Sequence, residues 1–127
     1  MTNTNVTIVW TLPVPSTALI YGVRFQQLQR RMCCLSFEYE EDDGLVKRSI
    51  LFHEVQAFKC TYLKACTVFM IKMSYDKVVK LADSEWLSEV TRQVSQQDVI
   101  MKPLNHYMIY FDDGPCFEFV CTHFTLE

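Results

Sequence analysis

Three histidines and six cysteines are the side chains of this chain that could ligate a metal ion. Zinc sites usually show short paired spacings such as C-x-x-C or H-x-x-x-H. Here His53, His106 and His123 lie far apart in the sequence. Cys33 and Cys34 are adjacent, and the other four cysteines are scattered. The spacing therefore predicts no metal site, and it indicates no cofactor.

Nucleophilic catalysis by a cysteine would need a nearby base and a lowered thiol pKa. Cys116 and Cys121 are the candidate nucleophiles, with His106 and His123 as candidate bases. Cys121 follows Phe119 at a two-residue interval, which is typical of a core thiol on a strand. Cys116 lies beside a predicted turn and is the more exposed candidate. Packing is the interpretation that we favour for both thiols, so we assign no catalytic residue.

Acidic residues cluster in one predicted hairpin. Charge runs usually mark a solvated face or a turn. The alternative is an acidic surface that captures a basic protein partner, because complementary potentials speed encounter and enforce specificity. That alternative predicts four binding residues, Glu38, Glu40, Glu41 and Asp42.

Charge and hydropathy exclude several partners. The chain has 12 basic and 15 acidic residues and a net charge of −3, so nucleic acid is not expected to bind. No apolar run approaches the roughly 18 residues of a membrane span. The first five residues are polar and do not resemble an export signal, which predicts a cytoplasmic protein with reduced thiols. Three glycines are too few for a phosphate-binding loop.

The length of 127 residues fits a single domain, residues 1–127. Half of the residues are apolar, which is enough for a packed interior without a metal or a disulfide.

The first half of the chain is predicted to be strands. Val6, Ile8, Trp10 and Leu12 alternate with other residues and should share one face of a strand. Residues 17–25 should be extended, with Gly22 marking a bulge or a close backbone approach. Residues 26–31 are polar and are predicted to be a connector.

A hairpin is predicted next. Residues 33–40 alternate between apolar and polar, residues 41–44 form a turn, and residues 45–52 return as the partner strand. Residues 58–73 keep no single period but are rich in β-branched and aromatic residues, so they are predicted to be mostly extended. Residues 75–81 are left open between helix and strand.

The clearest helix signal begins at Ser84, a good N-cap, and ends between Val94 and residue 97. Trp86, Leu87, Val90 and Val94 line one helical face, which should dock on the sheet. Trp86 and Leu87 could also anchor a partner, but the continuing stripe favours core packing.

Residues 107–111 and 117–121 are apolar runs joined by turn residues, which predicts a second hairpin. Because the first of these runs is apolar on both faces, it should be central in the sheet or covered by the helix. The predicted fold class is therefore α+β: a mainly antiparallel sheet, curved or barrel-like, with one amphipathic helix before a C-terminal β-hairpin.

The C-terminal third carries a resemblance to a group of known proteins. The helix begins S-E-W-L at residues 84–87, a strand reads H-Y-M-I-Y-F-D-D at residues 106–113, and the next strand contains E-F-V at residues 118–120. This pattern resembles small bacterial proteins of unknown function, and some similar domains are immunity proteins for secreted toxins. The resemblance implies a compact α+β domain and no particular mechanism.

The sequence favours a non-enzymatic protein that binds another protein, with an immunity-like role as one version. The alternative is a small-molecule binder or an enzyme with a pocket in a curved sheet, lined by Tyr110, His106, Cys116 and His123. Open strand edges raise a third option, because a homodimer is one way to cover them.

Overall fold

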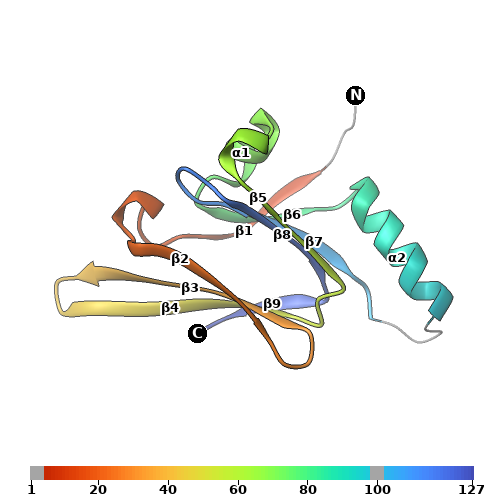
Figure 1. Cartoon of the computed structure of the whole chain (residues 1–127), viewed down its shortest axis with the longest axis horizontal. Coiled ribbons are helices and arrows are strands. Elements are labelled where there is room, and N and C mark those ends of the chain that lie inside the picture. The colour runs from red at the N-terminus through yellow and green to blue at the C-terminus, as the bar shows by residue number, and fades with distance from the viewer. Residues whose placement is uncertain (1–4, 98–101) are drawn as a thin grey trace.

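The computed structural model describes residues 5–97 and 102–127 and contains two antiparallel sheets packed face to face (Figure 1). Residues 1–4 lie outside the described part of the chain. Sheet A has the strand order β1 (Val6–Thr11), β6 (Lys77–Leu81), β7 (Asn105–Tyr110), β8 (Cys116–Cys121) and β5 (Ala57–Thr61). Sheet B has the order β2 (Ile20–Leu28), β3 (Met32–Glu41), β4 (Gly44–His53) and β9 (His123–Leu126).

The described residues also form two α-helices, α1 (Val68–Ser74) and α2 (Glu85–Gln97). Within the same part of the chain, short 3-10 turns precede β2 and α1, η1 (Ser16–Ala18) and η2 (Leu63–Ala65). Figure 1 shows both α-helices on the side of sheet A that faces away from sheet B. Neither helix is long and apolar enough to span a bilayer.

The antiparallel α+β architecture is as predicted, but the sheets do not close into a barrel. A barrel needs hydrogen bonds between every pair of neighbouring strands around the ring. Here β1 and β5 are free edges of sheet A, and β2 and β9 are free edges of sheet B. The chain instead passes between the sheets in loops, such as the one that begins at Pro13, so that two separate layers form.

The main core lies between the two sheets. Leu35, Ile50 and Phe52 of sheet B are fully buried and face Ile109 and Phe119 of sheet A. The Phe52 and Phe119 rings stack with their centroids 4.0 Å apart. Each large apolar side chain buried in this way stabilises the fold by about 1.5–3 kcal/mol relative to exposure.

A second, smaller core covers the outer face of sheet A. Val79, Met108 and Tyr110 pack there against Met70 and Ile71 of α1. This cover explains why β7 is apolar on both faces. The strand order confirms that β7 is central in sheet A, as predicted for residues 107–111.

The prediction that residues 58–73 are mostly extended is wrong, because strand β5 ends at Thr61, η2 follows at residues 63–65, and α1 begins at residue 68. The Thr67 side chain caps this helix by accepting a hydrogen bond from the Met70 backbone N–H at 3.1 Å. Only seven residues are helical, which is too short a stretch to show a helical period in the sequence. Packing against sheet A, which the sequence pattern does not reveal, stabilises this short helix.

The regular alternation predicted for residues 6–12 is wrong in the middle of β1. Ile8 pairs with Val79, whereas Trp10 pairs with Val78, so Val9 is an extra residue in the strand. This bulge reverses the alternation. Trp10 therefore packs against the core between the sheets, while Ile8 is 57% exposed.

The other local predictions are largely confirmed. The β3–β4 and β7–β8 hairpins form, and the Leu87 backbone N–H donates to the Ser84 hydroxyl at 3.0 Å, as expected of an N-cap. Residues 26–28 are not a connector, because β2 continues through them. Since β2 is an edge strand with an exposed outer face, the polar Gln26 and Gln27 are compatible with strand structure there.

Candidate binding site

An irregularity in β2 opens the outer face of sheet B. Ile20 of β2 pairs with Glu38 of β3, and the next pair is Arg24 with Ser36. Three residues of β2 therefore lie opposite the single residue Phe37 of β3. The surplus chain of β2 must arch away from the sheet, which leaves a hollow between the two strands.

Two consecutive residues in the left-handed region produce this bulge. Tyr21 has φ of 63° and Gly22 has φ of 69°, so the bulge expected at Gly22 is confirmed. Glycine adopts this conformation without strain, whereas for a bulky residue such as tyrosine it costs about 1–2 kcal/mol of conformational free energy. The Tyr21 side chain is also 86% exposed, so no packing contact of the folded chain explains its position.

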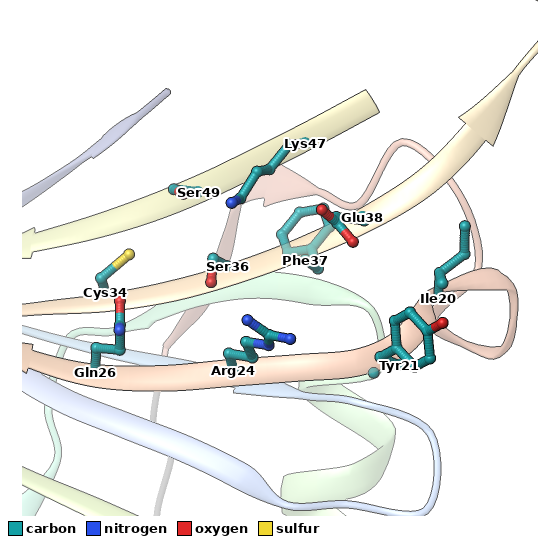
Figure 2. A pocket seen from close by; sticks show the side chains of 11 residues that line it. Ile20, Tyr21, Arg24, Gln26, Cys34, Ser36, Phe37, Glu38, Lys47 and Ser49 are labelled. Atoms are coloured by element: carbon teal, nitrogen blue, oxygen red, sulfur yellow. The ribbon is translucent and has the colours of Figure 1, made fainter. Parts of the chain in front are cut away.

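The hollow has a volume of about 290 Å³, and we call it the bulge pocket (Figure 2). It is lined by residues of β2, β3 and β4: Ile20, Tyr21, Gly22, Arg24, Gln26, Cys34, Ser36, Phe37, Glu38, Lys47 and Ser49.

Cross-strand pairing arranges the polar side chains of the bulge pocket in rows. One row runs from Arg24 on β2 through Ser36 on β3 to Ser49 on β4. The neighbouring row contains Glu38 on β3 and Lys47 on β4. In Figure 2 the charged ends of Arg24, Glu38 and Lys47 extend from three different strands over the pocket.

The charged groups of the bulge pocket have no ion-pair partner within the described residues. Ion pairs at residues 5–97 and 102–127 join Lys102 to Glu54 and His106 to Glu118, and neither includes a pocket residue. The guanidinium group of Arg24, the ammonium group of Lys47 and the carboxylate of Glu38 are therefore available to a bound group.

The predicted acidic binding residues lie beside this pocket. Glu38 lines it, and Glu40, Glu41 and Asp42 are exposed at the tip of the β3–β4 hairpin. Figure 1 shows this tip projecting at one end of the molecule. Sequence reasoning thus located one end of the candidate surface but missed Tyr21 and Arg24, because a bulge that brings them together depends on strand pairing.

The four residues of the predicted pocket are not brought together. Tyr110 and Cys116 are cross-strand partners buried beneath α1, and His106 lies in a separate polar network beneath α2. His123 is exposed on β9 of the other sheet, where its ring stacks on that of His53 with centroids 4.5 Å apart.

A serine, a histidine and a glutamate meet between α2 and sheet A. His106 Nδ1 lies 2.8 Å from Ser84 Oγ, and His106 Nε2 lies 2.9 Å from Glu118 Oε1. An imidazole protonated at Nε2 satisfies every group, because Ser84 then donates to Nδ1 while accepting from the Leu87 N–H. His106 is only 3% exposed and the Trp86 ring meets its edge, so this network joins the helix to the sheet.

The buried thiols are far from the thiolate form. Burial, and then the charge of Glu118, raise the pKa of the Cys116 thiol well above its usual range. Burial and the neighbouring Cys33 raise the pKa of Cys121 to about 12. Cys121 is a core thiol as predicted, but the expectation that Cys116 is the more exposed of the two thiols is wrong, because sheet A and α1 bury it fully.

The six cysteines are all free thiols. Across residues 5–97 and 102–127, no three histidine, cysteine, aspartate or glutamate side chains are grouped so that they could hold a metal ion.

Comparisons with known proteins add no relative. No protein-family model, no curated protein and no solved structure matches the chain. The resemblance of residues 84–87, 106–113 and 118–120 to small bacterial proteins stays a prediction.

Proposed function

We propose that this is a non-enzymatic binding protein whose partner is another protein. The partner would contact the outer face of sheet B, over the bulge pocket and the acidic tip of the β3–β4 hairpin. The observation that carries the proposal is Tyr21, which is 86% exposed and held in the left-handed region at the rim of the pocket.

Backbone strain of this kind persists only where the surrounding structure enforces it, and it concentrates at binding sites. An exposed tyrosine at the rim of a hollow is also a typical interface anchor, because it contributes a large contact area at a small entropic cost. Leu45 adds a second apolar group, since it is 59% exposed and pairs with Glu40 across the hairpin.

The acidic tip suggests the charge of the partner. Glu40, Glu41 and Asp42 are exposed together, so a partner with basic side chains would be steered toward this end of the sheet. An immunity protein that neutralises a basic toxin in the bacterial cytoplasm is one version of this proposal. It is supported by the resemblance of the C-terminal third to such proteins.

The test is affinity capture from the source cells, read by quantitative mass spectrometry, with matched variants. The wild-type protein and the control Tyr62→Ala should retain the same partner, because Tyr62 is 73% exposed but lies outside the bulge pocket. Tyr21→Ala, and separately the triple variant E40Q/E41Q/D42N, should lose it. A partner retained equally by all four proteins would overturn the proposal.

A second copy of the chain is the other candidate partner, and it is favoured by β1. This edge strand contains no charged residue, and Ile8 on it is well exposed, so two copies could pair edge to edge. Sedimentation of the wild type against Ile8→Lys tests this option. A dimer that the lysine abolishes would support it, and a monomer in both cases would exclude it.

A further inference from the structure

We propose that the bulge pocket binds a carboxylate side chain, an aspartate or glutamate of the partner. This inference rests on the proposed function, because it names the chemistry that the partner presents to that surface.

Hydrogen-bond donors from three strands line the pocket. Arg24, Ser36 and Ser49 form one continuous row across three strands, and Lys47 stands next to Ser49 in the neighbouring row. These side chains supply a guanidinium fork, two hydroxyls and an ammonium group. Planar guanidinium groups bind carboxylates through two parallel hydrogen bonds, which favours a bidentate contact to Arg24.

The volume limits the size of the group that is bound. Pockets for complete small-molecule ligands are about 300–1,000 Å³ in volume. The bulge pocket, at about 290 Å³, lies just below that range. It has room for one side chain of the partner with water molecules beside it.

The charges of the pocket residues favour a bound group with a single negative charge. Arg24 and Lys47 contribute two positive charges, and Glu38 contributes one negative charge to the same pocket. One carboxylate neutralises the remaining positive charge. A phosphate dianion would bring a second negative charge close to Glu38, which like-charge repulsion disfavours.

The rim supplies an apolar contact. Ile20 and Tyr21 line the end of the pocket nearest the bulge, and Figure 2 shows both side chains on that side. The methylene groups of an aspartate or glutamate can pack there while the carboxylate reaches the donor row.

Together with the acidic tip, the pocket defines a charge pattern for the partner. An acidic side chain would enter the pocket beside basic side chains that face Glu40, Glu41 and Asp42. An arrangement of both signs distinguishes partners more sharply than a uniform charge would, because a misplaced partner meets like charges.

The experiment is a heteronuclear NMR titration of the purified protein at constant ionic strength. The probes are N-acetylglutamate N-methylamide, its glutamine counterpart, N-acetylglycine and inorganic phosphate. The glutamate probe should shift the Ser36 and Ser49 amide signals saturably. The Arg24→Gln and Lys47→Gln variants should bind it at least about tenfold more weakly, because each loses one or more charge-assisted hydrogen bonds. The control Arg92→Gln, an exposed change on α2, should bind it normally.

Several outcomes would overturn the assignment. Equal shifts with the glutamine probe would show that the charge is not recognised, and tighter binding of phosphate would replace the carboxylate with another anion. Tighter binding of N-acetylglycine would assign the site to a chain terminus instead of a side chain. If Arg24→Gln does not fold, Arg24→Lys keeps the positive charge but loses the guanidinium fork, and unchanged binding by that variant would contradict the bidentate contact.

Different experimental results would overturn the carboxylate assignment and the proposed function. If capture depends on Tyr21 but the glutamate probe never binds, the binding surface stands and the carboxylate assignment fails. If the probe binds through Arg24 but the Tyr21→Ala variant still captures the partner, the pocket is an anion site unconnected with a protein partner.

Discussion

His106 Nε2 lies 2.9 Å from Glu118 Oε1 on the neighbouring strand, and both side chains are buried between α2 and sheet A. The pair is a polar contact in an otherwise apolar layer. The other ring nitrogen of His106, Nδ1, contacts the Ser84 hydroxyl, which caps α2. One network therefore connects the start of the helix to two central strands.

Removing the imidazole should destabilise the protein strongly. His106→Ala leaves the Glu118 carboxylate buried without its partner, and we expect a loss of about 3 kcal/mol in the free energy of unfolding. The control Lys102→Ala removes the exposed ion pair with Glu54 and should cost less than about 1 kcal/mol. Urea denaturation measures both, and equal losses would contradict the structural role of the network.

Tyr21 should oppose stability while supporting binding. Asparagine tolerates the left-handed region better than tyrosine does, so Tyr21→Asn should raise the free energy of unfolding by about 0.5–1 kcal/mol. Tyr62→Asn, at an exposed position where φ is not positive, should bring no gain. Thermal denaturation compares the two variants. A loss of stability in Tyr21→Asn would show that the tyrosine supports the fold.

His53 should make stability fall in mildly acidic solution. Burial and the charge of His123 lower the pKa of His53 from its ordinary value of 6.5, although Glu54 and Glu127 act in the opposite direction. The unfolded chain therefore takes up a proton at a higher pH than the folded chain does. The contribution of His53 is complete above about pH 6.5 and is lost as the pH falls through the lower folded pKa.

Denaturation curves at several pH values test this dependence. His53→Asn should flatten the decline in stability below about pH 6.5 relative to the wild type. An identical decline in both proteins would assign the effect to other groups.

The cysteines should react with iodoacetamide in the order of their exposure. Cys60 is exposed and Cys66 half-buried, and burial raises the pKa of both thiols, so their alkylation should be slow but measurable in the folded protein. Cys116 and Cys121 should react only after unfolding. Peptide mapping with and without urea gives the order, and rapid labelling of Cys121 in the folded protein would contradict its burial.

Local features of the fold could be predicted where one short stretch of sequence contains the whole signal. The two hairpins follow from alternating residues around turn sequences, and the start of α2 follows from the Ser84 hydroxyl and the apolar stripe that begins at Trp86. Gly22 marked the bulge because glycine is the residue that adopts its backbone conformation without strain.

Other features depended on contacts between distant segments. Helix α1 is stabilised by sheet A, the extra residue Val9 is set by pairing with β6, and the division into two sheets depends on which strands share hydrogen bonds. Glu118 is a charged residue in an otherwise apolar strand, and its partner, His106, is on another strand, so the sequence does not reveal that the carboxylate is buried and paired.

The same division applies to the candidate site. The amino-acid sequence by itself determined the acidic tip of the β3–β4 hairpin, because neighbouring residues carry those charges. Only the tertiary structure placed Arg24, Ser36 and Lys47 around one hollow, because strand register decides which side chains from three strands meet on one face.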